Sequence, residues 1–149
     1  WLGQALKHCT RHQQPLGCLM LDIDHFKNIN ESHGHEASDQ VLIGFGKVVQ
    51  QQLRTSDVMI RYGGEEFVVL LPNCGIADAI ALAQRMLQAV RETAIGALKP
   101  GAITASIGVA VWQEHKPLTG VELLSLADRR LYEAKSAGRN RVMPEVAPE

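Results

Sequence analysis

One part of the sequence, where two apolar segments are joined through a pair of glycines, limits the possible folds more than any other. The segments 57–62 and 67–71 have the composition of β-strands, and the second stops at Pro72. Between them, Gly63 and Gly64 suit a two-residue type I′ turn, which needs positive φ at both central positions. The sequence therefore predicts a β-hairpin with a tight glycine turn.

Two carboxylates, Glu65 and Glu66, follow the glycine pair directly. Successive side chains of a strand point to opposite faces, so only one of the two faces a given pocket. Beside bare glycines, that carboxylate would let a ligand approach the backbone and an acidic group together. An ordinary solvated hairpin with acidic ends explains this stretch equally well when it is taken alone.

A continuous apolar run over residues 16–21 indicates a strand that is buried on both faces. The run leads into Asp22, Ile23 and Asp24. Carboxylates at the end of a buried strand, with a second acidic element on a nearby hairpin, offer the hard oxygen ligands that Mg²⁺ prefers.

Apolar periodicity and turn residues divide the rest of the chain. Ser38 or Asp39 is an expected helix N-cap, and Gly138 is the expected left-handed residue after the last helix. The sequence predicts helices over 1–13, 26–30, 38–53, 76–90 and 121–137, strands over 16–23, 57–62, 67–71, 102–111 and 141–143, and loops over 32–37, 93–100 and 113–117.

This order of elements predicts a single α/β (α+β) domain over residues 1–143, in which helices flank a mixed central sheet. Residues 144–149 are expected to form a disordered tail. The length of 149 residues and the hydrophobic content of 46% fit one globular domain.

Charge and cysteine content exclude several classes of protein. The formal net charge of −1 argues against bulk binding to nucleic acid or to an anionic membrane. No apolar run approaches the length of a membrane span, and no signal peptide is visible. Cys9, Cys18 and Cys74 are odd in number without CxxC spacing, which indicates reduced thiols in a cytoplasmic protein, with Cys18 in the core.

Several motifs follow one another in a fixed order: 22–30 (DIDHFKNIN), Gly34 with His35, Asp39, 63–67 (GGEEF), 106–110 (SIGVA), Ala127 with Asp128, Leu131 with Tyr132, Lys135, and 138–141 (GRNR). Together they resemble the GGDEF domain of bacterial diguanylate cyclases, in its GGEEF variant, over nearly the whole chain. The resemblance implies a sheet like that of nucleotide cyclases and polymerase palm domains.

Similar domains carry a Thr-Gly-Leu-x-Asn-Arg element just before the point where this sequence begins. We therefore expect a fragment of a longer protein with an N-terminal regulatory region. Any membrane anchor of the full-length protein would lie in that region.

The resemblance implies that two GTP molecules condense to cyclic di-GMP, with release of two pyrophosphates, in an antiparallel homodimer that requires Mg²⁺, or Mn²⁺ in its place. Asp22, the backbone carbonyl of Ile23, and Glu65 match the metal ligands of the family. Glu65 also matches the proposed general base, and Lys27 the lysine that stabilises the transition state. Asp24 and Glu66 match supporting positions.

The substrate contacts of the family also have matches here. Asn30 and Asp39 stand at the guanine-binding positions, where a carboxylate accepts from guanine N1–H and N2–H₂. The remaining matches are His35, Gly63 and Gly64 near the nucleotide, and Lys135 and Arg139 at the triphosphate. Ser38 and Glu31 depart from the glycine and aspartate of most members.

Several of these matches have a simpler explanation. Asp22 and Glu65 are alternatively a pair of surface acids, Lys27 a solvated lysine, and Asp24 or Asp39 a helix cap. Lys135 and Arg139 also complement the dipole of a helix C-terminus. The pair formed by His33 and His35 lacks the third ligand that a transition-metal site would need.

Arg54 and Asp57 form an Arg-x-x-Asp sequence just before the hairpin, where the family carries a product-inhibition site, and Arg85 matches a secondary arginine of that site. Arginine recognises guanine O6 and N7 or phosphate, so the site would bind cyclic di-GMP. A surface arginine and a turn-opening aspartate are the alternative. For the whole chain, the alternatives are a silent domain that senses cyclic di-GMP or GTP, and a dimerisation module without a ligand.

Overall fold

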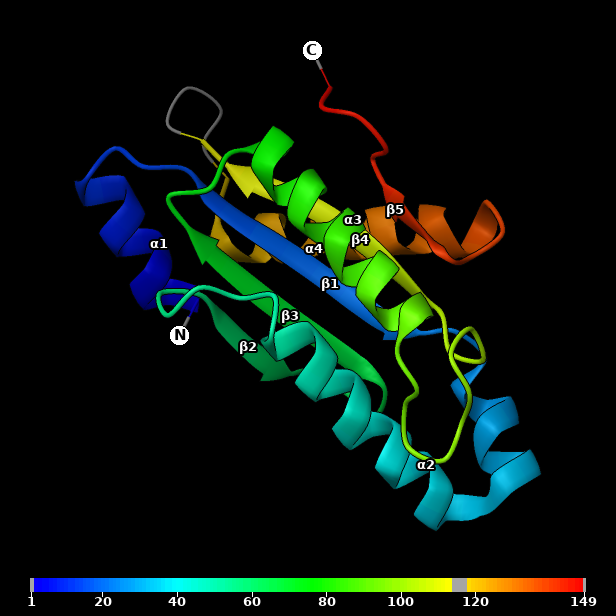
Figure 1. The fold of residues 1–149 in the computed structure, drawn as a ribbon. Helices are drawn as coiled ribbons and strands as arrows, with labels where there is room; N and C mark the ends of the chain where they lie inside the picture. The colour runs from blue at the N-terminus through cyan, green and yellow to red at the C-terminus, as the bar shows by residue number, and fades with distance from the viewer. Residues whose placement is uncertain (1, 114–117, 149) are drawn as a thin grey trace.

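The computed structural model describes residues 2–113 and 118–148, and within these ranges five strands form one mixed sheet (Figure 1). Their order across the sheet is β2-β3-β1-β4-β5. Every adjacent pair is antiparallel except β4 with β5, which is parallel. The strands are β1 (Leu16–Ile23), β2 (Val58–Arg61), β3 (Glu66–Pro72), β4 (Ala105–Trp112) and β5 (Arg141–Met143).

Helices cover both faces of the sheet, as the sequence predicts. In Figure 1, α2 and α3 lie in front of the sheet and α4 lies behind it. The two hydrophobic clusters agree: one joins a face of the sheet to α2 and α3, and the other joins the opposite face to α1 and α4. The helices are α1 (Leu2–Arg11), α2 (Phe26–Gln50), α3 (Ile76–Glu92) and α4 (Gly120–Ser136).

The central strand β1 is buried along its whole length, which confirms the prediction from its apolar run. Because side chains alternate along a strand, Leu19 and Leu21 belong to one cluster while Cys18 and Met20 belong to the other. Burial raises the pKa of the Cys18 thiol to about 12, so the thiol stays protonated in the core. β1 is therefore a rigid support, and its carboxyl end carries Asp22.

Helix α4 lies close against β4. Arg130 donates a hydrogen bond to the carbonyl oxygen of Val109 at 2.6 Å, and Gly108 lies directly beneath the helix backbone. Desolvation lowers the pKa of Arg130 from its ordinary value. This close contact determines where the carboxyl end of α4 lies relative to the carboxyl end of β1.

The predicted loop over 32–37 is wrong. α2 spans Phe26–Gln50 as two helical segments that meet at a kink at Gly34, where φ is 84° and ψ is 171°. A single glycine accommodates the change of direction, so no loop is needed. Ser38 and Asp39 lie inside the helix rather than at its start, and Ser38 Oγ donates to the carbonyl of His35 at 2.9 Å, so the predicted N-cap is also wrong.

The hairpin is confirmed, but its type I′ turn is wrong. Gly63 and Gly64 are not among the residues with positive φ, and the ladder ends before them at the pair of Arg61 and Phe67. The Arg61 guanidinium donates to the Gly64 carbonyl at 2.8 Å and to that of Gly63 at 3.3 Å. These bonds hold a wider turn than two residues would make, and Glu65 lies in that turn.

Other boundaries shift by a few residues. β4 begins at Ala105 rather than at residue 102, although the Thr104 carbonyl already accepts from Asp24 N at 2.9 Å. Residues 144–148 form no helix or strand, and Gln84 Nε2 donates to the Glu145 carbonyl at 3.3 Å.

Parts of three predicted elements, at residues 1, 114–117 and 149, lie outside the described residues. Among the residues that the structure describes, no helix has both the length and the apolar character to cross a membrane.

Candidate functional site

A pocket of about 230 Å³ opens where the carboxyl end of β1, the β2–β3 turn, the start of α2 and the end of α4 meet. It brings acidic groups from β1 and the turn together with basic groups from α2 and α4. The residues that line it are Asp22, Ile23, Asp24, His25, Phe26, Lys27, Asn28, Glu65, Lys135 and Arg139.

Sheet register explains why Asp22 and Glu65 lie near each other although 43 positions separate them in the sequence numbering. Asp22 pairs with Glu66 in the β1–β3 ladder, and the Ile23 N–H donates to the Glu65 carbonyl at 3.4 Å. The last residues of β1 thus lie beside the β2–β3 turn.

Asp22 is only 3% exposed, and its carboxylate forms an ion pair with Lys135 Nζ. Burial raises the pKa of Asp22 to about 6, the bond from Lys135 opposes that rise, and the nearby Glu65 and Glu66 add to it. The folded protein therefore holds a carboxylate whose charge is incompletely offset by its own side chains.

The donor set fits a hard divalent cation. Two acidic residues, Asp22 and Glu65, line the same pocket together with Ile23. Within the described residues, no three His, Cys, Asp or Glu side chains gather into a complete metal site. Mg²⁺ usually takes one or two carboxylates and completes its shell with water and substrate phosphates, so two carboxylates suit it.

Asp24 does not cap the following helix. The N-cap of α2 is His25, with φ of 55° and no side-chain cap bond. The Asp24 carboxylate instead accepts hydrogen bonds from Thr104 Oγ1 at 2.7 Å, Ser106 Oγ at 2.7 Å and Asn140 N at 2.9 Å. Asp24 therefore joins the end of β1 to β4 and to the segment after α4.

Lys135 and Arg139 reach the pocket from the end of α4. The helix ends in a Schellman motif, in which Gly138 N donates to the Lys135 carbonyl at 3.3 Å and Arg139 N to that of Ala134 at 3.0 Å. Gly138 has φ of 123°, which confirms its predicted place after the helix.

Lys27 lines the pocket from the first turn of α2. Its side chain is 88% exposed, and its nearest acidic partner is Glu31 at 4.0 Å. An exposed lysine at the rim of the pocket remains free to contact a phosphate, so the geometry is compatible with either interpretation of Lys27.

The expected guanine-binding residues are not among those that line this pocket. Asn30 precedes the break of α2 at Gly34, whereas His35 and Asp39 follow it and are exposed. Ser38 Oγ lies 3.3 Å from Asn30 Oδ1, as a donor, and so connects the two parts of the helix.

Three residues of the pocket, His25, Phe26 and Asn28, were not candidates from the sequence. The signal that could have found them is their position, directly after the carboxylates at the end of β1. Conversely, Gly63 and Gly64 flank Glu65 in the turn but do not line the pocket itself.

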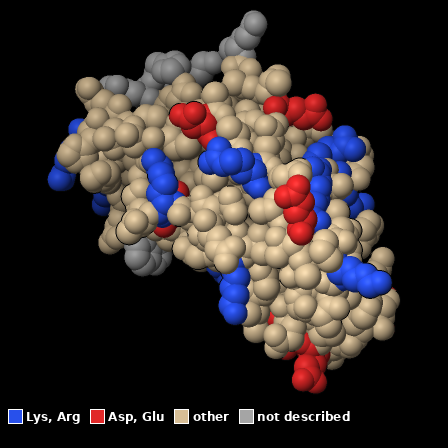
Figure 2. Space-filling model, in the orientation of Figure 1, with Lys and Arg blue, Asp and Glu red and all other residues tan. Residues whose placement is uncertain are grey.

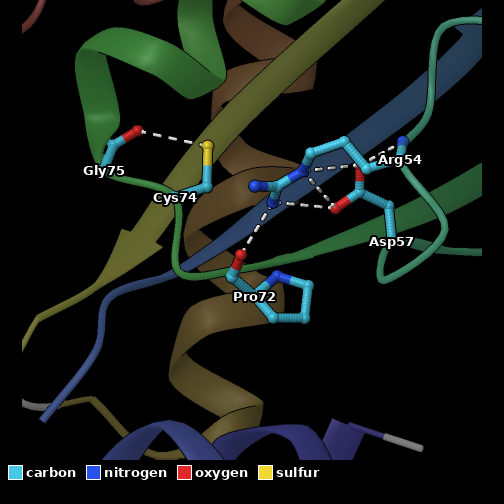
Figure 3. A network of polar contacts seen from close by, with 5 residues as sticks. All are labelled: Arg54, Asp57, Pro72, Cys74 and Gly75. Atoms are coloured by element: carbon cyan, nitrogen blue, oxygen red, sulfur yellow. Dashed lines mark hydrogen bonds and ion pairs between the residues drawn. The ribbon is translucent and has the colours of Figure 1, made fainter.

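A second pocket, of about 240 Å³, brings Arg54, Asp57 and Arg85 together, as the sequence predicts. Figure 3 shows the Arg54 guanidinium turned toward Asp57 and the Pro72 carbonyl. It donates to the Asp57 carboxylate at 3.0 Å and to the Pro72 carbonyl at 2.7 Å. The hydrogen bond to Asp57 raises the pKa of Arg54, which keeps the guanidinium charged.

Asp57 acts here as a support for Arg54. Its side chain is fully buried, and it also accepts from the Arg54 backbone N–H at 2.8 Å. This pocket lies at the end of β2 and β3 opposite to the turn that holds Glu65. β3 alone separates the two ends by about 20 Å at the usual rise of a strand.

Figure 2 shows basic and acidic side chains interspersed over the face that α2 and α3 cover. Several basic side chains gather at the right of this view, over the end of α4 and β5. This local positive charge lies on the side of the molecule where α4 ends, although the net charge of the chain is only −1.

Comparison with known proteins identifies the family to which the chain is similar. The family model for the GGDEF domain of diguanylate cyclases matches residues 1–141. Diguanylate cyclase A of Treponema denticola is 41% identical over 133 residues, which cover 87% of this chain and 35% of that protein.

Solved structures are similar over almost the whole fold. The active GGEEF domain of a diguanylate cyclase from Vibrio cholerae gives a TM-score of 0.85 at 32% identity and covers 93% of this chain and 88% of that one. The GGDEF domain of DgcB from Caulobacter crescentus, solved in complex with c-di-GMP, gives a TM-score of 0.85 at 30% identity, over 95% and 84%.

The chain spans 24% to 37% of the length of the first curated relatives that it matches. The similarity nevertheless extends over the pocket, both arms of the hairpin and the end of α4. The family match over residues 1–141 and this shared fold lead to one conclusion: the chain belongs to the GGDEF family of diguanylate cyclase domains.

Proposed function

We propose that this chain condenses two GTP molecules into cyclic di-GMP and two pyrophosphates as a homodimer. The observation that carries the proposal is the single pocket that holds Asp22 and Glu65 opposite Lys135 and Arg139. Such a site offers carboxylates to a divalent cation and cationic side chains to a triphosphate, which is the arrangement that phosphoryl transfer requires.

In the proposed reaction, the 3′-hydroxyl of one GTP attacks the α-phosphate of the GTP on the partner subunit. A new phosphorus–oxygen bond forms, the bond from the α-phosphate to its bridging oxygen breaks, and pyrophosphate leaves. Glu65 accepts the proton of the hydroxyl. The same step in the opposite sense closes the ring.

The cation is best assigned to Asp22, Glu65 and the Ile23 carbonyl. A bound Mg²⁺, or Mn²⁺ in its place, would neutralise phosphate charge and stabilise the attacking and leaving oxygens. Lys135 and Arg139 hold the triphosphate, and Lys27 stabilises charge in the transition state. The ion pair of Lys135 with Asp22 shows that the lysine already reaches the acidic end of β1.

Chromatographic separation of nucleotides after incubation with GTP and Mg²⁺ tests the proposal directly. We expect cyclic di-GMP and pyrophosphate in a ratio of one to two. Binding of a GTP analogue without any product would instead identify a silent sensor domain, and absence of both would identify a dimerisation module.

The first prediction concerns the dimer. Each subunit is expected to hold one GTP, while the product contains two guanines, so turnover requires two chains. Specific activity should rise with protein concentration until the dimer is saturated, and light scattering at the same concentrations should report the association. Constant specific activity in a preparation that stays monomeric would contradict this prediction.

The second prediction concerns base specificity. Asp39 accepts from the N1–H and N2–H₂ of guanine, whereas adenine presents an acceptor there, so kcat/KM for ATP should be about a hundredfold lower or more. Asp39→Ala should bring the kcat/KM values for GTP and ATP closer together, mainly by lowering the kcat/KM for GTP. Glu36→Ala, which removes another exposed acid from α2, is the matched control. Comparable wild-type use of ATP would contradict the assignment of Asp39 and Asn30.

We also propose that cyclic di-GMP inhibits the domain at the second pocket. Arg54 and Arg85 would bind guanine and phosphate groups of the product, with Asp57 holding Arg54 in place. Since this pocket lies about 20 Å from Glu65 along β3, bound product would hinder the meeting of two GTP-loaded domains rather than compete with GTP.

The third prediction follows from that site. Arg54→Ala should keep turnover near the wild-type rate and lower the affinity for cyclic di-GMP about tenfold or more, because it removes a charged, bidentate donor. Arg85→Ala should weaken inhibition without disturbing the buried Asp57. Titration calorimetry with cyclic di-GMP, beside rate curves at several GTP concentrations, measures both effects. Inhibition that excess GTP fully relieves would place the inhibitor elsewhere.

A further inference from the structure

The segment that follows α4 has an unusual backbone. Gly138, Arg139 and Asn140 all have positive φ, with values of 123°, 63° and 52°. Glycine adopts such angles readily and asparagine tolerates them, but Arg139 carries a side chain that disfavours them. A turn of this kind persists only where the surrounding structure holds it.

Asp24 holds the turn from the side of the sheet. Its carboxylate is 5% exposed and accepts from Asn140 N at 2.9 Å. The hydroxyl groups of Thr104 and Ser106 donate to the same carboxylate at 2.7 Å each, so its orientation is fixed by the neighbouring strand and the residue before it. A fixed acceptor, in turn, fixes the position of the Asn140 amide.

Arg91 holds the turn from the opposite side. It lies in the last turn of α3, and its guanidinium donates from Nε to Asn140 Oδ1 at 2.8 Å and from Nη2 to the Asn140 carbonyl at 3.0 Å. Asn140 is therefore bonded through its N–H to Asp24 and through both of its oxygen atoms to Arg91.

Arg139 lies between the end of α4 and this anchored asparagine. Its N–H is bonded to the Ala134 carbonyl at 3.0 Å, and the residue lines the pocket that contains Asp22 and Glu65. With both of its neighbours held, the Arg139 backbone has little freedom, which fixes the direction in which its side chain leaves the backbone beside the pocket.

We propose that Arg91 is a positioning residue for the binding of a nucleoside triphosphate. Arg91 holds Asn140 from one side while Asp24 holds it from the other, and the anchored Asn140 keeps the neighbouring Arg139 directed at the pocket. This inference rests on the proposed function, since it assigns the phosphates to the pocket. Arg91 itself does not line the pocket, and its side-chain hydrogen bonds go to Asn140; it would act on the triphosphate through the turn.

Without Arg91, Asn140 loses the two hydrogen bonds that the guanidinium donates to its oxygen atoms, but its N–H remains bonded to Asp24. The turn gains freedom to leave the disfavoured angles, and Arg139 then has to be ordered again when the phosphates bind. The affinity for the triphosphate should fall roughly tenfold, which corresponds to losing part of the free energy of one charge-assisted hydrogen bond.

The test is titration calorimetry of the chain with the α,β-methylene analogue of GTP and Mg²⁺. Arg91→Ala should bind the analogue about tenfold more weakly. The charge-matched control is Arg129→Ala, which removes an exposed arginine from α4 and is expected to bind like the wild type. Amide hydrogen exchange at Asn140 should be faster in Arg91→Ala and unchanged in Arg129→Ala.

A double-mutant cycle separates positioning from a general loss of stability. In an Arg139→Ala background, adding Arg91→Ala should weaken binding no further, because the side chain to be positioned is gone. In turnover assays, Arg91→Ala should raise KM for GTP more than it lowers kcat. Additive effects of the two substitutions on binding would overturn the proposal.

The outcomes also distinguish this inference from the proposed function. A wild-type chain that binds the analogue but forms no product would leave the positioning role standing and refute the cyclase. Wild-type affinity in Arg91→Ala, together with faster exchange at Asn140, would refute the positioning role and leave the cyclase standing. A wild-type chain that does not bind the analogue would refute both.

Discussion

Asp22→Asn is expected to reduce formation of cyclic di-GMP by about a hundredfold or more, which is the scale expected when a metal-binding charge is lost. The amide keeps the shape of the carboxylate but not its charge, so the cation would lose one of two carboxylates in the pocket. Glu65→Gln should have an effect of similar size. Product assays at saturating Mg²⁺ measure the loss, with Glu133→Gln, an exposed acid on α4, as the matched control.

The same substitution should not weaken the fold. The pKa of Asp22 is raised to about 6 from an ordinary value of 3.8, so the folded state binds the proton more tightly than the unfolded state does. Stability from this group is complete below the unfolded pKa and is lost as the pH rises through about 6. At neutral pH, ionisation of the buried Asp22 therefore lowers the free energy of unfolding by up to about 3 kcal/mol, and asparagine avoids this loss because it does not ionise.

Urea unfolding without Mg²⁺, at pH 4.5 and pH 7.5, tests this second effect. Wild-type stability should fall between these two values by more than that of Asp22→Asn, and the variant should be at least as stable at pH 7.5. If Asp22→Asn turned over GTP at the wild-type rate, Asp22 would not be a ligand that the reaction requires. A large loss of stability would show instead that the ionised carboxylate supports the fold.

Much of the fold follows from local patterns in the sequence. The apolar run of β1, the arms of the hairpin and the apolar faces of α3 and α4 were predicted to within a few residues. The end of α4 was also predictable, because the Schellman motif depends on one glycine, Gly138, and on bonds within a single turn.

The errors lie at two changes of chain direction, where a particular side-chain bond or a single backbone angle decides the conformation. The turn after β2 was expected to be a tight glycine turn, but the Arg61 guanidinium bonds the carbonyls of Gly63 and Gly64 and holds a wider one. The loop expected over 32–37 is helical because one glycine, Gly34, takes up the whole change of direction. Neither outcome can be seen from residue composition alone.

Some features of the candidate site could be predicted from the sequence and others could not. That Asp22 and Glu65 share a pocket was expected from the motifs, and the structure brings them together through sheet register. The role of Asp24 was open, since its partners Ser106 and Asn140 lie 82 and 116 positions away in the chain. The ion pair of Lys135 with Asp22 likewise spans 113 positions and has no local signal.

Gly108→Ala is expected to destabilise the protein by about 3 kcal/mol or more, at the upper end of the usual cost of overpacking. A Cβ at this position would lie 2.1 Å from the Ala127 carbonyl oxygen and 2.3 Å from Leu131 N. Both are backbone atoms of α4, so a rotamer change cannot relieve the contact. The helix would have to move away from β4 or the sheet would have to bend.

That movement would also reach the site, because α4 carries Lys135 at its carboxyl end and Lys135 pairs with Asp22. We therefore expect Gly108→Ala to lose activity even at temperatures where it remains folded. The matched control is Gly3→Ala in α1, where nothing lies within 4 Å of the added Cβ. That substitution should stabilise the helix by up to about 1 kcal/mol, because alanine is the better helix former.

Urea unfolding of both variants, with turnover measured well below their melting temperatures, tests whether the contact of α4 with β4 controls stability, activity or both. Unchanged stability in Gly108→Ala would mean that α4 can lie farther from β4 at little cost. Lost stability with full turnover would mean that the contact supports the fold but does not place Lys135. Only a loss of both, with Gly3→Ala at least as stable and as active as the wild type, shows that the close contact of α4 with β4 sets the geometry of the end of the pocket that we propose binds phosphate.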